Sequence, residues 1–587
     1  MRHARELAVV VAVVALGGLV RALRATDDAL LGAEPLVLAL TEVASVALLA
    51  LLVSLVFGRR RRPPDAVGVA SAYLVLAALG AGARQWLPEG RGAIVVALAA
   101  LFLGRRLVRR WPALRWALAA IAVVPAWVAL PSGRDALPRA KGGAGDQRIV
   151  LLTLDTFRAD HLGAIGGSWF DVRTPHLDRL AGQGLLFTQG VSPAPLTLPS
   201  HAAMLTGQLP DAIGTVQNGR PLRGDVSTVA AELSAAGWTT GAFVSAAVLD
   251  RHSGIDRGFA HFDDLFADHP LWAQGSIARG LVGMGILNAP AQQRRGDRTV
   301  ARALRWLDHQ AGPVFLWVHL YDPHSPYAPP EHWASAYDPA QPGLPGSPEQ
   351  LAPMRRRQRT ERAMLFDTTP RDLRPSLAAY AGEISWTDEV AGRLLAALRP
   401  DDAVVVAADH GESLVEHGYF LNHGRHVYQP SVRVPIIVVA PGHGVAGARD
   451  DHPTPLTAIA PTLRALAGLP AAGSLLDRHA APPDDEELRS YGVLQQARTM
   501  LVLKRRQQVA WRRGDSKWIV DQHGVAEHYD LARDPAELHD DAAQHPDRDT
   551  WAARGVAEIE RINELRGHGR ASREQADALR ALGYVDD

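Results

Sequence analysis

Apolar residues follow two different patterns along the chain, and the change comes near residue 147. Before that point, long apolar runs follow one another with short arginine-rich gaps between them. They occupy residues 6–23, 35–57, 66–83, 92–104 and 114–131. After that point, short apolar runs alternate with stretches of helical period. The first pattern is typical of membrane-spanning helices and the second of an α/β domain.

The long apolar runs predict a multi-span membrane region over residues 1–131, with about five helices. A span needs about 20 apolar residues, and a cleavable signal peptide would give a single run near the start. Arginines cluster at the N-terminus, after the second run and after the fourth run, which favours a cytoplasmic N-terminus. The sequence therefore predicts an integral, multi-pass protein of a bacterial plasma (inner) membrane, in contact with the lipid bilayer, whose remainder is extracytoplasmic.

Residues 132–147 are rich in Pro and Gly without an apolar period, so they read as a linker to a domain at 148–499. In that domain, apolar runs suited to strands buried on both faces alternate with amphipathic helical stretches. The strands are expected at 148–155, 313–319, 403–409 and 434–441, and the helices at 176–183, 226–236, 298–310 and 376–398. This alternation predicts an α/β fold with a mainly parallel sheet between two layers of helices.

Residues 500–587 are expected to form a small C-terminal subdomain. QQVAWRRG (507–514) and KWIVDQHG (517–524) predict a β-hairpin, and a helical tail follows from about residue 548. The polar stretch 328–375 has several prolines and no clear period, so it is expected to be a lid or a partly ordered insertion.

Charge and cysteine content exclude several classes of site. Residues 1–147 hold 18 Lys/Arg and 9 Asp/Glu of the 62 and 62 in the chain, which leaves 44 and 53 beyond them. The soluble part is therefore mildly acidic, and nothing predicts a nucleic-acid partner. The chain has no cysteine, which excludes disulfides, thiolate metal sites and thiol nucleophiles.

Polar side chains stand at the ends of three predicted strands. Asp155 ends the first, His319 the second, and Asp409 with His410 the third. In open parallel sheets the ligand site forms at the carboxyl ends of the strands, so we expect these residues to share one site.

The segment LTLPSHAAMLTG (196–207) looks like a loop that leads into a helix. Thr197 would lie at or near the N-cap, and Pro199 in the first turn. The first-turn amides and the helix dipole favour an anion there. The same pattern also fits a plain threonine cap with no chemical role.

Several motifs, in this order and spacing, strongly resemble the sulfatase family, over about residues 148–587. They are LLTLDTFRADHLG (151–163), TPHLDRLAGQGLLF (174–187), LTLPSHAAMLTGQLP (196–210), DPHSPY (322–327), DHGESLVEHG (409–418), PTLRALAGLP (461–470), HYDLARDPAEL (528–538) and LRALGYV (579–585). The resemblance implies an alkaline-phosphatase-like fold. A membrane region followed by such a domain is also similar in architecture to lipoteichoic acid synthases and phosphoethanolamine transferases.

The resemblance implies a nucleophile at Thr197, where sulfatases have the cysteine of C-x-P-S-R that becomes formylglycine. Pro199 and Ser200 are retained, and His201 replaces the arginine. Threonine cannot become formylglycine by that route. Family members with threonine here act on phosphorus esters, so the change favours a phosphoester substrate.

The resemblance also implies a divalent metal ion held by Asp155, Thr197, Asp409 and His410. Sulfatases usually have Asn or Gln at the position of His410 and a second Asp at that of Thr156, and they bind Ca²⁺. Three oxygens and an imidazole suit Zn²⁺ or Mn²⁺, which we favour, with Ca²⁺ and Mg²⁺ left open.

One metal ion is favoured over two. A second could draw on Asp322, His324 and His423, but these residues do not reproduce the Asp-x-x-x-His pair of two-metal relatives.

Further site residues follow from the motif match. Asn218 lies 21 residues after Thr197, a spacing similar to that of the anion-binding Asn in related hydrolases, although an Asn-Gly turn would look the same. His324 matches the histidine of the family's anion site, and a histidine there could protonate the leaving group. His423 and Arg425 lie where many sulfatases have a lysine near the leaving oxygen. Arg425 could instead be a solvated loop residue.

The sequence thus predicts a membrane-anchored, metal-dependent hydrolase or transferase that cleaves a phosphoester through a phospho-Thr197 intermediate. Phosphorylated or sulfated lipids, glycans and small molecules are the candidate substrates. One alternative is a sulfuric ester hydrolase that lacks formylglycine. Another is a non-catalytic, membrane-anchored binding protein.

Overall fold

The computed structural model describes residues 147–264, 266, 293–351, 372–483, 485–492 and 507–567. The predicted membrane spans, nearly all of the predicted linker and part of the 328–375 stretch lie outside these ranges. Within the ranges, no helix has both the length and the apolar character needed to cross a membrane.

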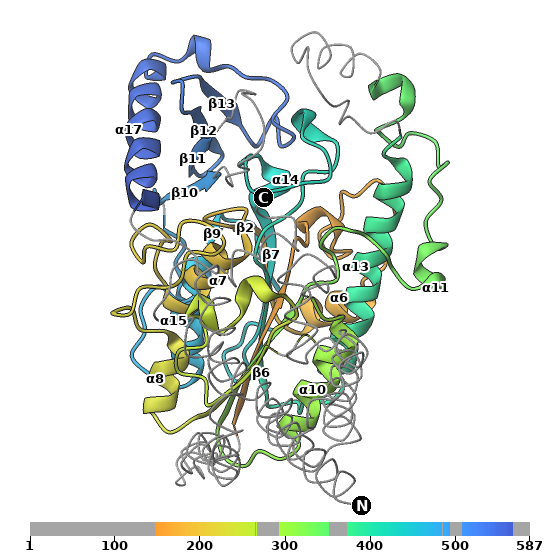
Figure 1. The fold of residues 1–587 in the computed structure, drawn as a ribbon, viewed down its shortest axis with the longest axis vertical. Coiled ribbons are helices and arrows are strands. Elements are labelled where there is room, and N and C mark those ends of the chain that lie inside the picture. The colour runs from red at the N-terminus through yellow and green to blue at the C-terminus, as the bar shows by residue number, and fades with distance from the viewer. Residues whose placement is uncertain are drawn as a thin grey trace, which may run out of the picture. The chain divides into compact units, whose positions relative to one another are not determined.

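A nine-stranded mixed sheet forms the centre of the domain (Figure 1). Its strands are β1 (Arg148–Leu154), β2 (Leu185–Val191), β3 (Thr239–Phe243), β4 (His261–Asp263), β5 (Val314–Leu320), β6 (Ala403–Ala408), β7 (Arg433–Val439), β8 (Ala448–Asp450) and β9 (Thr454–Pro455). Their order is β4-β3-β5-β1-β6-β7-β2-β8, and β9 pairs with β2.

The four apolar runs predicted as strands form β1, β5, β6 and β7. β5 and β6 are buried at every residue and β1 at every residue but its first, because helices cover both faces of the sheet. β7 is antiparallel to its two neighbours, and every other pairing is parallel. The predicted, mainly parallel sheet is confirmed.

Two layers of helices enclose the sheet. The α-helices of the described residues are α6 (Pro175–Gln183), α7 (Thr197–Thr206), α8 (Val229–Ala235), α10 (Gly296–Leu307), α11 (Glu331–Ala334), α13 (Arg374–Leu395), α14 (Gln429–Val432), α15 (Ile459–Leu466), α16 (Leu475–Ala480) and α17 (Arg548–Gly567), of which α17 packs on a separate sheet. α6, α10 and α13 pack together on one side, while α7, α8 and α15 pack together on the other (Figure 1). The four predicted helices correspond to α6, α8, α10 and α13, so the predicted sandwich of helices is confirmed.

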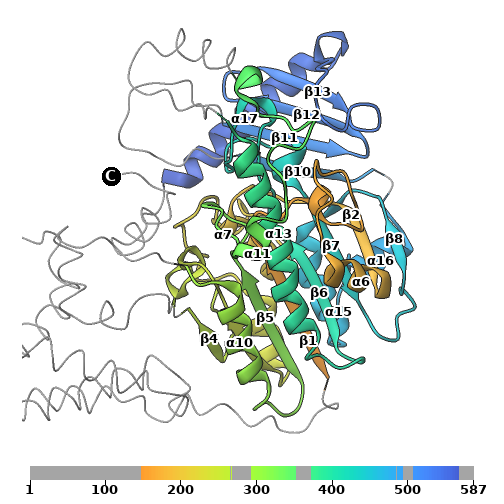
Figure 2. The ribbon, with the colours of Figure 1, turned by 90° about the vertical axis from the view of Figure 1, so that its right-hand side faces the viewer.

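A second, four-stranded antiparallel sheet lies beside the first (Figure 2). Its strands are β10 (Glu487–Gly492), β11 (Gln508–Arg513), β12 (Ser516–Asp521) and β13 (Ala526–Asp530). β11 and β12 form the predicted hairpin, and α17, the predicted helical tail, packs on the sheet. β10 belongs to this sheet although it precedes residue 500.

The buried ion pair of Lys517 and Glu537 links the small sheet to the main domain through hydrogen bonds to the backbone of Val427 and Gln429. The ammonium group of Lys517, on β12, donates hydrogen bonds to Glu537 Oε1 at 2.6 Å and to the carbonyl of Val427 at 2.7 Å. Lys517 and Glu537 are 2% and 1% exposed. Val427 follows His423 by four residues, so this pair supports a loop that carries a candidate site residue.

Candidate active site

Three neighbouring strands deliver polar residues to one edge of the main sheet. β1 lies between β5 and β6, and its last residue, Leu154, is in register with Leu320 and Ala408. The residue after β1 is Asp155, and the residue after β6 is Asp409. Because the three strands are parallel, their carboxyl ends meet, as the sequence predicted.

Asp155, Asp409 and His410 form a compact set of ligand atoms. One atom from each lies within 4.8 Å of the other two. Nε2 of His410 is 3.9 Å from Asp155 Oδ1 and 3.6 Å from Asp409 Oδ2. All three residues are fully buried.

The hydrogen bonds around this set leave its inner atoms available to a cation. Nδ1 of His410 donates to the carbonyl of Gly411 at 2.9 Å, which leaves Nε2 as a bare lone pair. Asp409 uses Oδ1 to accept the amides of His410 and Thr156, while Oδ2 has no hydrogen-bond partner among the described residues. Neither oxygen of Asp155 has a well-formed hydrogen bond within that part of the chain.

The pKa shifts of these three residues also indicate a cation site. Burial raises the pKa of Asp155, although His423 and the nearby Thr197 hydroxyl oppose that rise. Burial and the charge of Asp155 raise the pKa of Asp409, and burial lowers that of His410. Two buried carboxylates and a neutral imidazole are stable together when a divalent ion supplies the missing charge. The donor set therefore fits the divalent metal that the sequence predicted.

Thr197 is the first residue of α7 and is fully buried. Its side chain lies close enough to Asp155 to lower the pKa of that carboxyl group. Leu196 takes the N-cap position, so Thr197 stands one residue inside the helix. Oγ of Ser200 donates to the carbonyl of Asp409 at 2.7 Å and so ties α7 to the end of β6. The hydroxyl of Thr197 is thus held at the ligand set by its helix.

His201 has a structural role. Its Nδ1 donates to the carbonyl of Thr197 at 2.8 Å, and its Nε2 accepts the hydroxyl of Thr153 at 3.0 Å. The Thr153 hydroxyl in turn accepts Nε1 of Trp317 at 3.0 Å. Both ring nitrogens are used within the core, so His201 positions Thr197 and does not replace the family arginine as a charged group.

Asn218 lies beside the first turn of α7. Its Oδ1 accepts the amide of Leu198 at 3.0 Å, while its buried Nδ2 makes no hydrogen bond to any described residue. Asn218 thus lies beside the residue that follows Thr197, and its Nδ2–H groups remain available as donors. Two residues later, the 8% exposed Arg220 has a buried Nη1 without a hydrogen-bond partner among the described residues. Burial lowers the pKa of Arg220.

The rings of His410, His423 and His324 lie next to one another at the site, the first pair tilted and the second edge to face. His423 lies 4.5 Å from His410 and 4.9 Å from His324, between ring centroids. Nδ1 of His423 bonds Oε1 of Glu412 at 3.2 Å. Burial opposes protonation of His423, but Glu412, Asp155 and Asp409 together raise its pKa. Nδ1 of His324 donates to the carbonyl of Ser325 at 2.6 Å, and burial with the neighbouring His423 lowers its pKa.

Glu412 was not among the predicted site residues, although it lies inside the motif DHGESLVEHG (409–418). It is fully buried, and besides holding His423 it accepts the hydroxyl of Tyr327 at 3.2 Å. Its place three residues after Asp409 was the available signal. His319 was expected at the strand ends and does lie there, with Nε2 at 3.4 Å from Asp155 Oδ2. Burial lowers the pKa of His319 to about 3, so it stays neutral.

Two predicted neighbours lie outside the buried cluster. Arg425 is exposed. Asp322, a candidate ligand for a second metal, accepts Nε1 of Trp386 and the amide of Gly296. The Asp322 carboxylate is thus engaged by Trp386 and Gly296 and not by His324 or His423.

Local ion pairs hold the loop after β1. Arg158 makes a two-armed contact with Asp160 at 2.9 and 2.6 Å and another with Glu416 at 2.8 Å. Because its guanidinium is engaged in this way, Arg158 stabilises the loop.

A profile of the sulfatase family matches residues 147–469, which is more than half of the chain and includes this whole site. The chain belongs to the sulfatase family. It is thus a hydrolase of the alkaline phosphatase superfamily, as predicted, and members of this family bind a divalent metal ion.

Relatives of this sulfatase-family chain are about a quarter identical to it over the aligned regions, which cover half to two thirds of the chain. An arylsulfatase of Clostridium perfringens is 23% identical over 66% of this chain and 89% of its own length. A choline-sulfatase of Rhizobium meliloti is 25% identical over 51% of this chain and 63% of its own length. Human iduronate 2-sulfatase is 26% identical over 50% of this chain and 60% of its own length. The chain thus spans just under two thirds of the last two.

Solved structures share the fold. A phosphonate monoester hydrolase of Agrobacterium radiobacter superposes with a TM-score of 0.52 at 22% identity, over 72% of this chain and 95% of the other. A protein solved with its substrate D-glucosamine-2-N,6-O-disulfate gives 0.53 at 18% identity, over 73% and 100%. Both phosphonate and sulfate ester hydrolases therefore use the scaffold of this sulfatase-family chain.

Proposed function

We propose that this sulfatase-family enzyme cleaves a phosphorus ester and that Thr197 is its nucleophile. The observation that carries the proposal is the setting of Thr197. It occupies the family's nucleophile position in a chain without cysteine, and its hydroxyl lies beside Asp155 at the ligand set. A single hydroxyl with a carboxylate and a metal site beside it suits attack on phosphorus.

Asp155, Asp409 and His410 would hold the divalent ion, with Thr197 as the fourth ligand, and Zn²⁺ or Mn²⁺ suits this set best. Such an ion lowers the pKa of a bound hydroxyl and offsets charge on the phosphoryl oxygens. Nδ2 of Asn218 is placed to donate to one of those oxygens, since its Oδ1 is already fixed by α7.

In the first step, Thr197 Oγ attacks in its ionised form, having released its proton to solvent, and forms a bond to phosphorus while the bond from phosphorus to the leaving oxygen breaks; the second step regenerates this ionised oxygen. His423 donates its proton to that oxygen, because Glu412 holds its ring and favours its charged form. The family resemblance had suggested that His324 could be the donor. His324 has a lowered pKa, so it is neutral, and its Nδ1–H donates to the carbonyl of Ser325. We therefore assign it a place lining the site and not the role of acid.

The second step releases the phospho-threonine. Water or an acceptor hydroxyl attacks phosphorus and gives its proton to His423, which is now neutral, while the bond to Thr197 Oγ breaks. Water makes the enzyme a hydrolase, and a glycan or lipid head group makes it a transferase. His423 thus returns to its starting state, and the proton count closes.

We also propose that the apolar runs in residues 1–131 anchor the enzyme in a bacterial plasma membrane, with the catalytic domain extracytoplasmic. Anchorage would place the site near phosphorylated lipids and glycans. Protease protection of a C-terminal tag in membrane vesicles of known orientation tests this topology, and a tag protected with cytoplasmic marker proteins would refute it.

Sulfate ester hydrolysis without formylglycine is the second candidate function. Similarity to an arylsulfatase, a choline-sulfatase and an iduronate 2-sulfatase favours it. Sulfated glycans or small molecules would then be the substrates. Turnover of p-nitrophenyl sulfate far above that of bis-p-nitrophenyl phosphate would select this function over the first.

The decisive experiment compares wild type, Thr197→Ser and Thr197→Ala on bis-p-nitrophenyl phosphate. We expect Thr197→Ala to lose about 10³-fold or more in kcat, because a missing nucleophile removes the covalent route. Thr197→Ser keeps a hydroxyl and should retain measurable turnover. Metal content of each variant is measured in parallel to separate loss of chemistry from loss of the ion. Undiminished turnover by a metal-loaded Thr197→Ala protein would refute the proposal.

A further inference from the structure

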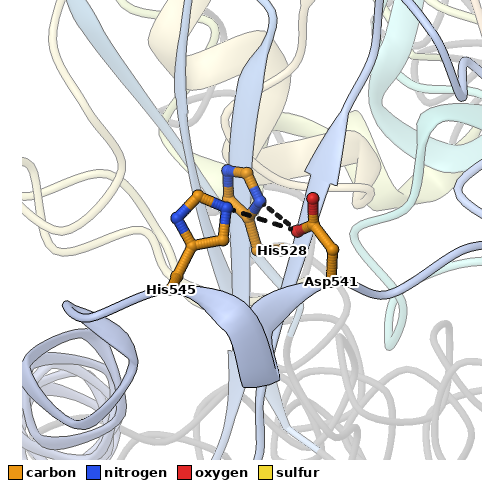
Figure 3. Close-up of side chains that lie close together, drawn as sticks. All are labelled: His528, Asp541 and His545. Atoms are coloured by element: carbon orange, nitrogen blue, oxygen red, sulfur yellow. Dashed lines mark hydrogen bonds and ion pairs between the residues drawn. The ribbon is translucent and has the colours of Figure 1, made fainter.

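The geometry points to a second metal site, on the small sheet, formed by His528, Asp541 and His545. One ligand atom from each residue lies within 4.8 Å of the others. Figure 3 shows both imidazoles directed at the same carboxylate oxygen, Asp541 Oδ1. The distances to it are 2.5 Å from His528 Nδ1 and 3.5 Å from His545 Nε2.

The backbone builds this cluster from two segments. His528 lies in β13, and its carbonyl accepts the amide of Asp541 at 3.2 Å. Asp541 is the N-cap and His545 the C-cap of η7 (Ala542–Gln544), a single turn of 3-10 helix, so one short turn carries both side chains. The three side chains are therefore positioned by main-chain hydrogen bonds and not by one another alone.

The surroundings hold the imidazoles in place. The indole of Trp518 lies 4.7 Å from the ring of His528 and 5.4 Å from that of His545, and the two imidazoles are 3.9 Å apart. His528 is 5% exposed, while the side chains of Asp541 and His545 are 47% and 37% exposed. An ion from solvent can thus reach the carboxylate and the outer imidazole, and it meets a fixed inner ligand.

Ser516 supplies the support that a metal-binding histidine needs. Its Oγ lies 2.9 Å from Nε2 of His528. A neutral His528 carries one ring proton, which must sit on Nε2 once Nδ1 binds a metal. The Ser516 hydroxyl can accept as well as donate, so its oxygen accepts the hydrogen bond from that Nε2–H group. The ordinary reading is a hydrogen-bonded His-Asp-His cluster, in which the proton sits between Nδ1 and Asp541.

Two imidazoles and one carboxylate suit Zn²⁺, which takes nitrogen and oxygen ligands at about 2.0–2.2 Å in tetrahedral sites. The 3.5 Å separation of His545 Nε2 from Asp541 Oδ1 already matches two corners of such a tetrahedron. His528 Nδ1 and Asp541 Oδ1 share a hydrogen bond at 2.5 Å and would move apart by less than about 1 Å as the metal replaces the proton. Water would fill the fourth position.

The metal would have a structural role. It would tie β13 to the turn that precedes α17, and so fix that helix on the small sheet. The inference is independent of the proposed function, because none of its residues belongs to the catalytic set.

The test measures zinc bound per chain after the full-length protein is stripped with EDTA and dialysed against micromolar Zn²⁺. We expect His545→Ala to bind one ion fewer than wild type, whatever the occupancy of the catalytic site. His539→Ala is the matched control, since His539 lies in the same segment, 85% exposed, and outside the cluster. It should bind as many ions as wild type.

Ser516→Ala gives a second and milder variant. We expect it to keep the site with about 10- to 100-fold weaker zinc affinity, the usual effect of losing a supporting partner. Stripped wild type, His545→Ala and Ser516→Ala should unfold at similar temperatures, and zinc should raise that temperature most for wild type. Equal zinc content in wild type and His545→Ala would overturn the inference and leave the hydrogen-bonded cluster. So would an equal thermal response to zinc.

Discussion

Glu383 should make the enzyme less stable as the pH rises. It lies on α13, 2% exposed, where Oε1 accepts the amide of Ala328 at 2.8 Å and Oε2 has no hydrogen-bond partner in the described ranges. Burial and the charge of Asp322 raise its pKa from 4.5 to about 8, against the Ala328 amide and Arg295. Between those values the folded chain keeps a proton that the unfolded chain releases, so stability falls as the pH rises.

The magnitude follows from the shift. At pH 7 the folded carboxyl group is mostly protonated, while the unfolded one is ionised, because pH 7 lies about 2.5 units above its pKa of 4.5. At 1.36 kcal/mol per unit, the free energy of unfolding at pH 7 is about 3 kcal/mol lower than near pH 4.5. The Glu383→Gln substitution removes the titratable proton, and the new side-chain carbonyl can still accept the Ala328 amide. The variant should match wild type near pH 4.5 and exceed it by about 3 kcal/mol at pH 7.

Chemical denaturation of the full-length chain at several pH values measures this difference. Glu389→Gln on the same helix is the matched control with the opposite sign. Burial opposes ionisation of Glu389, but Trp333, Arg393 and His332 bond its carboxylate and lower its pKa. That variant should lose stability above the ordinary pKa of Glu. A Glu383→Gln protein with the same pH dependence as wild type would refute the reasoning.

Three further variants probe the site and its support. Glu412→Gln removes the charge that holds His423 as an acid, so turnover of an alkyl phosphodiester should fall about 10²-fold, and that of a p-nitrophenyl ester, whose leaving group needs no proton, much less. Equal losses on both esters would contradict the acid role of His423. Asn218→Ala should lower kcat about 10²-fold at unchanged metal content, and loss of the metal instead would show that Asn218 only fixes α7. Lys517→Met should lower the free energy of unfolding by about 3 kcal/mol by leaving Glu537 buried and unpaired, and the added change Glu537→Gln should restore part of it in denaturant titrations.

The strands and the metal ligands could be predicted because buried parallel strands have a distinctive sequence. β1, β5 and β6 are continuous apolar runs, and the first polar residue after such a run marks the sheet edge where ligands bind. β3 escaped prediction because TTGAF has too few large apolar residues. Its Gly241 lets Trp306 of α10 pack directly on the strand, where a Cβ atom would be 2.5 Å from the indole. The antiparallel direction of β7 could not be predicted from its sequence either, because it depends on the path by which the chain returns to the sheet.

Residues carried by loops were accessible only through the family resemblance. Asn218, His324 and His423 come from three separate loops, and no periodicity relates them to Thr197. Their proposed roles depend on hydrogen bonds to Leu198, Ser325 and Glu412 that the folded loops create. Motif matching offered both His423 and Arg425 for the lysine position near the leaving oxygen, and only the fold shows that His423 is buried and Arg425 exposed.

A single hydroxyl at the nucleophile position has a stereochemical consequence. The ester of Thr197 has no second hydroxyl that could expel the phosphoryl group, so release requires a second in-line attack at phosphorus. Two inversions give net retention of configuration, whereas direct attack by a metal-bound water gives inversion. Turnover of a diester made chiral at phosphorus with isotopic oxygen and sulfur, in methanol and water, should therefore give a methyl ester with retained configuration. Two substrates that differ only in the leaving group should also give the same ratio of methanolysis to hydrolysis products, because both pass through the same phospho-threonine. Inversion would exclude Thr197 as a covalent nucleophile while leaving the metal site and the family assignment intact.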